Sequence, residues 1–243
     1  MQQWYKEDLA YIHDVGFGDW AIASAPGILK ILAEAQLQNG LIIDLGCGSG
    51  LSARAFVNAG YRVLGIDLSE EMLKIAQKRV PEADFRLGSI FDVELPSCHA
   101  VTAIGECFNY LFDDRNNRPR RLQLFDQIYQ AVIPGGIFIF DVVEPGQVEP
   151  ETTTQSFLEG EDWTVLVEKF EDRKREILTR RIITFRQVGD VYRREEEVHT
   201  QQLYDAEAIA SELRQIGFQV CVSHHYGEYE LPKARAALVA RKG

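Results

Sequence analysis

Short apolar runs, separated by stretches with helical character, make up the first 142 residues of the chain. The runs lie at residues 41–45, 62–67, 84–87, 100–104 and 137–142. Runs of this length are typical of strands that are buried on both faces of a parallel sheet. The stretches between them at residues 51–59, 70–80 and 120–132 are predicted helices. Alternating strands and helices predict an α/β fold with a doubly wound, mostly parallel sheet.

Two more helices are predicted ahead of the first strand. One spans residues 5–15, and the other begins at Asp19, a residue suited to cap a helix, and is expected to be interrupted at Pro26 and Gly27. Residues 11–20 are rich in aromatic and polar side chains. Such side chains fit a segment that attaches the N-terminus to the core.

The pattern changes after the fifth predicted strand. Long strands are predicted at residues 163–170, 177–185 and 191–203, joined by polar turns. Charges of both signs are dense here, which a sheet with one solvated face explains. We therefore predict an antiparallel strand insertion over residues 151–203, within a single domain of residues 1–243.

A predicted helix and two further strands end the chain. Asp205 is positioned to cap the helix, which ends at Gly217, and the strands lie at residues 218–223 and 236–240. Together with the five earlier strands they make a seven-stranded sheet, with the antiparallel insertion after its fifth strand.

Composition narrows the classes of partner. The formal net charge is −11, whereas nucleic acid and anionic membrane surfaces are bound by basic faces, so neither partner is expected. The four cysteines form no Cys-x-x-Cys pair, and no metal site is expected. The sequence shows no secretory signal pattern, and no apolar run approaches the ~20 residues of a membrane span, which predicts a cytoplasmic protein.

The strongest chemical signal is the loop after the first predicted strand. Residues 41–50 read Leu-Ile-Ile-Asp-Leu-Gly-Cys-Gly-Ser-Gly, which places Gly46, Gly48 and Gly50 between a buried strand and a helix. Glycines there let the backbone approach a ligand closely, and the N-terminus of the helix offers unpaired N–H groups. Asp67 ends the second strand, where a carboxylate can accept both hydroxyls of a ribose.

This Gly-x-Gly-x-Gly spacing, with Asp44 ahead of it, differs from the Gly-x-Gly-x-x-Gly of dinucleotide-binding proteins. It resembles motif I of the S-adenosylmethionine-dependent methyltransferases with a Rossmann-like fold (class I), of the small-molecule type. The resemblance implies S-adenosyl-L-methionine as the cofactor and a helical lid over residues 1–38. It assigns cofactor binding to Asp44, Gly46, Cys47, Gly48, Gly50, Asp67, Leu68, Met72, Ser89, Ile90 and Glu106. Ser89 departs from the family pattern, in which an acid often accepts the adenine amine at this place.

The reaction that this resemblance implies is methyl transfer to nitrogen or oxygen of a small-molecule acceptor. A general base is needed only where the acceptor loses a proton, and Glu106 and His13 are the candidates. A polar contact with the cofactor suits Glu106 equally well, and a structural role suits His13 better. Residues 151–203 are expected to cover the acceptor side of the crevice or to join the subunits of a homodimer.

Two other functions fit parts of the pattern. A regulatory protein could keep the fold and bind S-adenosylmethionine without transferring the methyl group. An NAD-dependent oxidoreductase would share the strand and helix order, but the glycine spacing disfavours it.

Overall fold

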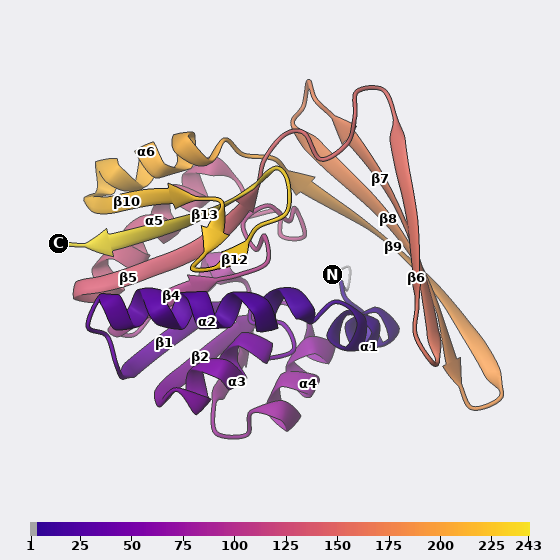
Figure 1. Ribbon diagram of the computed structural model, residues 1–243, viewed down its shortest axis with the longest axis horizontal. Coiled ribbons are helices and arrows are strands. Elements are labelled where there is room, and N and C mark those ends of the chain that lie inside the picture. The colour runs from indigo at the N-terminus through magenta and orange to yellow at the C-terminus, as the bar shows by residue number, and fades with distance from the viewer. Residues whose placement is uncertain (1–3) are drawn as a thin grey trace.

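A seven-stranded sheet forms the centre of the protein in the computed structural model, which describes residues 4–243 (Figure 1). Its strands are β1 (Gly40–Leu45), β2 (Tyr61–Asp67), β3 (Asp84–Leu87), β4 (Cys98–Ala103), β5 (Val132–Val143), β10 (Phe218–Ser223) and β13 (Arg235–Lys242). They lie in the order β10-β13-β5-β4-β1-β2-β3. Strands β1 to β5 pair in parallel, whereas β13 is antiparallel to both of its neighbours. The predicted doubly wound, mostly parallel sheet is confirmed.

Helices cover both faces of this sheet. Helices α2 (Asp19–Glu34) and α3 (Leu51–Asn58) pack on one face, and α5 (Arg118–Ala131) and α6 (Ala206–Ile216) pack on the other. Helix α4 (Glu70–Arg79) follows β2, and a single 3₁₀ turn, η1 (Ile90–Asp92), follows β3. The central strands β1, β2, β4 and β5 therefore bury side chains on both of their faces, which explains the continuous apolar runs in the sequence.

Strand β5 shows this burial on both faces. Phe138 and Phe140 pack with α5 and α6, whereas Ile137 and Ile139 pack with α2 and α3. The strand begins at Val132, five residues before its predicted start at residue 137, and includes the Pro134–Gly136 segment. An irregular register opposite Cys98 and Ala100 accommodates that segment.

The chain runs outward from β1 to β2 and β3, then returns to β4 on the other side of β1. Strand β1 thus pairs with β2 on one side and with β4 on the other. In such a sheet a crevice opens at the carboxyl ends of the two strands where the direction of winding reverses. The loops after β1 and β4 lie at this point.

The N-terminal segment forms α1 (Glu7–Gly16) and α2. Helix α2 begins directly after Gly18 and runs through Pro26 without a break, so the predicted interruption is wrong. Packing outweighs the helix-breaking tendency of proline, because Ile28 is fully buried and Gly27 lies too close to the backbone of Tyr226 to carry a side chain. Within residues 4–243 no single helix is long and apolar enough to cross a membrane; α1 and α2 meet that criterion only as a pair bent by 58°.

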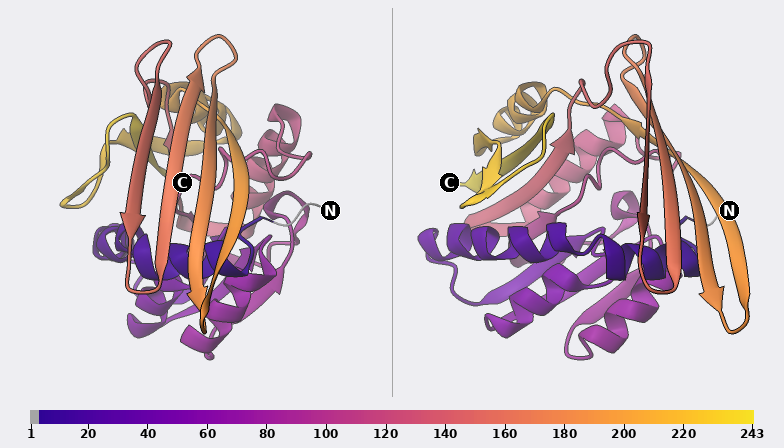
Figure 2. Two further views of the ribbon diagram at one scale, coloured as in Figure 1. Left: turned by 90° about the vertical axis from the view of Figure 1, so that its right-hand side faces the viewer. Right: turned by 45° about the vertical axis from the view of Figure 1, so that its right-hand side comes forward.

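The insertion is a second sheet of four antiparallel strands, β6 (Thr153–Glu159), β7 (Trp163–Asp172), β8 (Ile177–Val188) and β9 (Val191–Gln202), in that order. Strand β6 escaped prediction because all its residues are exposed, so no alternation marks it. Figure 2 shows the sheet standing beside the α/β core, with α1 between the two. We call its face toward α1 the inner face.

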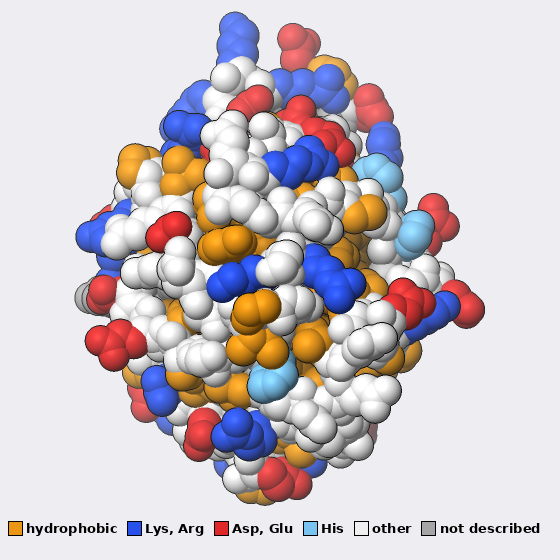
Figure 3. All heavy atoms as spheres, turned by 90° about the vertical axis from the view of Figure 1, so that its left-hand side faces the viewer, with side chains coloured by type: hydrophobic (Ala, Val, Ile, Leu, Met, Phe, Trp, Pro, Cys, Tyr) orange, Lys and Arg blue, Asp and Glu red, His pale blue; other side chains and the backbone are white. Residues whose placement is uncertain are grey.

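Two short strands complete the fold, β11 (His225–Tyr226) and β12 (Tyr229–Glu230), which form a hairpin against α2. Figure 3 shows the end of the molecule opposite the four-stranded sheet. Basic and acidic side chains are interspersed there around exposed apolar ones. The net negative charge is therefore not gathered into one patch on this face.

Candidate active site

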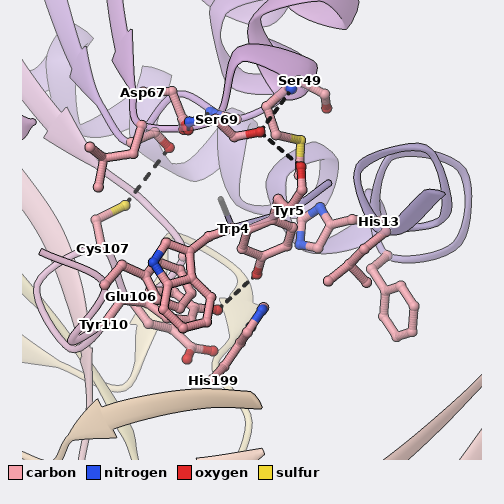
Figure 4. Close-up of a pocket in the computed structure, with 18 of the residues that line it drawn as sticks. Trp4, Tyr5, His13, Ser49, Asp67, Ser69, Glu106, Cys107, Tyr110 and His199 are labelled. Carbon is pink, nitrogen blue, oxygen red and sulfur yellow. Dashed lines mark hydrogen bonds between the residues drawn. The ribbon is translucent and has the colours of Figure 1, made fainter. Parts of the chain in front are cut away.

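A cavity of about 500 Å³ lies at the carboxyl ends of the parallel strands. Its walls come from the glycine loop, the loops after β2, β3 and β4, the N-terminal segment and the inner face of the four-stranded sheet. Figure 4 shows Asp67 and Ser69 on one side of it, Glu106, Tyr110 and His199 on the other, and Tyr5 between them. The predicted site residues that line it are His13, Asp44, Gly46, Cys47, Gly48, Asp67, Leu68, Met72, Ser89, Ile90 and Glu106.

The three glycines of the loop have different roles. Gly48 has a φ of +53°, and a Cβ there would point into open space beside the cavity. Gly46 has a φ of +70°, and a Cβ would come within 2.5 Å of Cys107 Sγ. Gly50 is not among the residues that line the cavity; it precedes α3 and packs against Ala76, so its predicted contact with the cofactor is replaced by a packing role.

Asp67 at the end of β2 holds this loop in place. One carboxylate oxygen accepts a hydrogen bond of 2.8 Å from the N–H of Gly48, and the other accepts one of 2.8 Å from the N–H of Ser69. Burial raises the pKa of Asp67, while these N–H groups act in the opposite direction. The carboxylate faces the cavity with lone pairs left to accept hydroxyl groups.

Asp44 near the end of β1 is buried, and only one of its two carboxylate oxygens has a hydrogen-bond partner among the described residues. Its Oδ1 accepts a hydrogen bond of 2.7 Å from the Thr102 hydroxyl, whereas Oδ2 has no partner among residues 4–243. Burial raises the pKa of Asp44 to about 7. A buried carboxylate oxygen without a donor is costly, so this wall of the cavity is suited to a cationic ligand.

The loop after β3 meets a carboxylate that the sequence did not point to. Ser89 accepts a hydrogen bond of 3.0 Å from the N–H of Phe91 and so begins η1. Beside it in the cavity lies Asp113, whose Oδ1 binds Arg115 and whose Oδ2 has no partner within the described part of the chain. The carboxylate of Asp113, from a loop later in the chain, therefore lies next to Ser89, the position where the family pattern has an acid.

Glu106 is held in a network of cations. Its carboxylate lies 2.9 Å from Arg180 of β8 and also pairs with Arg235 of β13 and with the amide of Gln201. Burial alone would raise its pKa, but Arg180 and Arg235 hold the pKa at about 2. A carboxylate with this pKa is a poor proton acceptor near neutral pH, so the geometry does not support the predicted role of Glu106 as a general base.

The backbone at Glu106 adopts a left-handed conformation with a φ of +67°. Asp141 of β5 stabilises this turn by accepting hydrogen bonds of 2.9 Å and 2.7 Å from the N–H groups of Gly105 and Glu106. The Tyr226 hydroxyl donates to the same carboxylate. Burial raises the pKa of Asp141 to about 6. The turn that carries Glu106 is thereby anchored to the core of the sheet.

His13 lies on α1 at the edge of the cavity. Its ring contacts Tyr5 edge-on and stacks on Phe17, with centroid separations of 5.1 Å and 6.2 Å. Burial lowers its pKa to about 4, so the imidazole is neutral at physiological pH. With this pKa the imidazole is a weaker proton acceptor near neutral pH than an ordinary histidine; His13 stays a candidate base because, unlike Glu106, it lines the cavity without an ion pair to any described residue.

Helix α1 is fixed over the cavity from both sides. On the core side, Asp14 forms a two-point ion pair with Arg79 of α4 at 2.7 Å and 2.8 Å, and Arg79 also donates to the carbonyl of Ser49. On the other side, Asp8 pairs with Arg186 and Arg193 of the four-stranded sheet. The inner face adds apolar contacts, because Leu9, Ile12, Trp163, Val165 and Ile182 form one buried cluster.

A second titratable pair lies on the inner face and escaped prediction from the sequence. His199 of β9 is fully buried, and its Nε2 lies 2.8 Å from Glu197, which also accepts hydrogen bonds from the N–H groups of Tyr5 and Lys6. Aromatic rings enclose the imidazole; they belong to Trp4, Tyr5, Tyr110 and Phe112. This pair ties the N-terminal segment to β9.

The reading of this sheet's charges as one solvated face is therefore partly wrong. Lys169, Arg180 and His199 all line the cavity on the inner face. The sequence does contain a signal for them, because these basic residues occupy the alternate strand positions whose side chains face inward. Using that signal requires knowing the register of the strands.

Comparison with known proteins indicates which kind of enzyme this is. A methyltransferase domain family matches residues 42–136. "Putative methyltransferase YqeM" of Bacillus subtilis (strain 168) is 29% identical over 199 residues, 77% of this chain and 77% of that protein. An S-adenosylmethionine-dependent methyltransferase from Clostridium acetobutylicum has a similar structure, with a TM-score of 0.80 at 19% identity, covering 98% of this chain and 99% of that one. The matched domain, this relative and the fold together indicate a class I S-adenosylmethionine-dependent methyltransferase.

A second solved structure is similar to this methyltransferase over its whole length. The sugar N-methyltransferase KedS8 from Streptoalloteichus matches with a TM-score of 0.79 at 18% identity, covering 100% of this chain and 96% of the other. At this identity the likeness shows the fold. It includes the four-stranded sheet, because the whole of this chain is covered.

The cavity of the methyltransferase fits its cofactor, S-adenosyl-L-methionine. The unpartnered Oδ2 of Asp44 suits a cationic group, the carboxylate of Asp67 suits hydroxyl groups, and the open space beside Gly48 admits a ligand close to the backbone. When bound, this cofactor supplies an activated methyl group on a sulfonium centre.

Proposed function

We propose that this methyltransferase transfers a methyl group to nitrogen or oxygen of a small organic acceptor held against the inner face of the four-stranded sheet. The observation that supports this most strongly is the division of one cavity into two halves of opposite charge. Asp44 and Asp67 lie in the half formed by the glycine loop, whereas Lys169, Arg180 and Arg235 lie in the other. The acidic half suits the cationic cofactor, and the other half is left for the acceptor.

In this proposal different residues of the acidic half bind different parts of the cofactor. Asp67 accepts the ribose hydroxyls, and Asp44 faces the ammonium group of the methionine part. Ser89 and Ile90 flank the adenine, and the unpartnered oxygen of Asp113 accepts the adenine amine. Asp113 thus takes the role that the family commonly gives to an acid at the position of Ser89.

Catalysis by this site relies mainly on placing the acceptor. When bound, S-adenosyl-L-methionine would supply the methyl group, and the residues of the other half of the cavity would hold the acceptor nitrogen or oxygen next to it. Holding the two reacting atoms in line and excluding water can supply up to ~7–11 kcal/mol in favourable cases. Glu106 keeps Arg180 and Arg235 in place, and His13, neutral at physiological pH, is the residue proposed to take a proton from the acceptor.

The N-terminal segment and the insertion act together as the cover of the site. Of residues 1–38, proposed as the lid, α1 lies over the cavity whereas α2 packs on the central sheet; residues 1–3 lie outside the described residues. The ion pair of Asp14 with Arg79 attaches α1 to the core, and the pairing of Asp8 with Arg186 attaches it to the four-stranded sheet. Opening of the site would have to break one of these two attachments.

The test is a turnover assay that separates binding from transfer. Calorimetry with S-adenosylhomocysteine measures cofactor binding, and single-turnover reactions with methyl-labelled S-adenosylmethionine test amines, hydroxyl compounds and carboxylates as acceptors. Labelled product from at least one small acceptor supports the proposal. Tight binding without transfer to any of them would favour a regulatory protein that binds the cofactor only.

A further inference from the structure

Three basic residues stand side by side across the inner face of the four-stranded sheet. Lys169 of β7 is directly opposite Arg180 of β8, and Arg180 is directly opposite His199 of β9. Directly opposite residues in an antiparallel sheet project from the same face with Cβ atoms about 4.5–5.5 Å apart, and like charges at this separation are destabilising. The pairing of Lys169 with Arg180 therefore requires compensation.

Glu106 compensates only part of this charge. Its single carboxylate is shared between Arg180 and Arg235, at 2.9 Å from the former. The Lys169 ammonium forms no ion pair or hydrogen bond with any residue from 4 to 243, and Arg180 Nε is buried without an acceptor in the same part of the chain. Three cations thus face one carboxylate in this half of the cavity.

The surroundings of Lys169 point to a ligand rather than to solvent. The side chain is half-buried and lines the cavity, and burial together with the nearby Arg180 lowers the pKa of Lys169. Its neighbours on the inner face are Val167 and Ile182, which are directly opposite each other in the next row of the sheet. An organic molecule can pack on this apolar row while an anionic group reaches the cations.

We propose that the acceptor carries a carboxylate or phosphate group, and that Lys169 binds this group together with Arg180. This assignment rests on the proposed methyl transfer, since it names the class of acceptor for that cavity. A charge-assisted hydrogen bond from the ammonium neutralises the added anion, and the planar guanidinium supplies a second donor through Nε. Glu106 orients Arg180 without occupying that donor.

The first experiment needs no turnover, so it remains informative if no methyl transfer is found. The complex with S-adenosylhomocysteine is heated in inorganic phosphate, in acetate and in chloride at equal ionic strength. Wild type is compared with Lys169→Met, Lys169→Arg and Lys174→Met; Lys174 is exposed in the turn between β7 and β8, outside the cavity.

We expect phosphate or acetate to raise the melting temperature of wild type, Lys169→Arg and Lys174→Met above the value in chloride by clearly more than that of Lys169→Met, which keeps only the general stabilising effect of the salt. The anion with the larger effect distinguishes a phosphate-bearing acceptor from a carboxylate-bearing one. Equal melting temperatures in all three salts, or an unchanged anion effect in Lys169→Met, would overturn the proposal.

The second experiment uses turnover where it occurs. Acceptors are compared in pairs that differ only in a carboxylate and its neutral amide, or a phosphate and the free alcohol. We expect the anionic member to have the lower KM, and Lys169→Met to reduce that preference by at least about tenfold, as loss of a charge-assisted contact does. A preference for the neutral member contradicts this assignment while leaving methyl transfer itself established.

Discussion

Glu106 and Arg180 form a buried ion pair across the cavity, with 2.9 Å between Oε2 of the carboxylate and Nη2 of the guanidinium. Glu106 lies in the loop after β4 of the central sheet, and Arg180 lies on β8 of the inserted sheet. The pair therefore joins two walls of the cavity. One is the loop after β4, and the other is the inner face of the four-stranded sheet, which is proposed to hold the acceptor. Because Arg235 binds the same carboxylate, one residue fixes three separate parts of the chain.

We predict that Glu106→Gln destabilises the fold strongly, because it leaves two buried guanidinium groups without a carboxylate. The free energy of unfolding should fall by about 3–5 kcal/mol, the range for removing one partner of a buried pair. Chemical denaturation at pH 7 measures it. Glu196→Gln is the matched control, since Glu196 also pairs with two arginines but on the exposed surface, where a much smaller loss of stability is expected.

The pH dependence gives this prediction a second check. The pKa of Glu106 is about 2 in the folded chain, below the ~4.3 of an unfolded glutamate. Its contribution to stability is therefore complete above the unfolded value and is lost as the pH falls toward 2. The difference between wild type and Glu106→Gln should be constant from pH 5 to pH 8 and shrink below pH 4. A constant difference down to pH 2 would count against the ion pair as its cause.

Gly48→Val should abolish binding of S-adenosylhomocysteine, because the added side chain would fill the space next to the cavity. Gly60→Val is the matched control: Gly60 also has a positive φ, at +92°, and open space around it, but it does not line the cavity. Both variants bear the same kind of backbone strain, so only the loss of ligand space distinguishes them. Calorimetry that shows equal affinities for the two variants would contradict the role given to Gly48.

Asp44 should make cofactor binding depend on pH around neutrality. Its pKa is about 7 in the free chain, and a cationic group beside Oδ2 favours the ionised form. Binding near pH 7 should therefore release a proton, and affinity should rise about tenfold between pH 6 and pH 8. Calorimetry of S-adenosylhomocysteine in buffers with different ionisation enthalpies counts the proton.

Two variants isolate the Asp44 effect. Asp44→Asn cannot ionise, so it should bind more weakly and show no rise with pH in this range. Thr102→Val removes a hydrogen bond that lowers the pKa of Asp44, so the rise should move to higher pH. An unchanged pH profile in Asp44→Asn would assign the linkage to another group.

The sequence was sufficient to bring the glycine loop and Asp67 to one cavity because these residues are close to one another along the chain. The glycine loop with Gly46 and Gly48 follows β1, and Asp67 ends β2. Because β1 and β2 are adjacent parallel strands, their carboxyl ends lie together, and the alternation of strands and helices in the sequence predicts this. Gly50 alone among the predicted cofactor-binding residues does not line the cavity, since its packing against Ala76 of α4 depends on how two helices meet.

The acceptor half could not be predicted in the same way. Arg180 reaches Glu106 from 74 residues away, and its direction depends on the register of β7, β8 and β9. A shift of one residue would turn Lys169 and Arg180 outward, and the sequence contains no motif that excludes this. The low pKa of Glu106 follows from these distant cations, so its role also depends on tertiary structure.

If His13 takes the proton of the acceptor, the rate of methyl transfer should not change with pH near the ordinary pKa of histidine. Burial lowers its pKa to about 4, whereas an unperturbed histidine titrates near ~6.5. His13 is then fully neutral above about pH 5, so single-turnover rates should be flat from pH 6 to pH 8 as far as this residue is concerned.

His13→Asn should lower the rate by about 10²–10⁴ with unchanged affinity for S-adenosylhomocysteine. His225→Asn, an exposed position outside the cavity, is the control. A loss of less than about threefold in His13→Asn would show that no general base acts there, and that placing the acceptor carries the reaction.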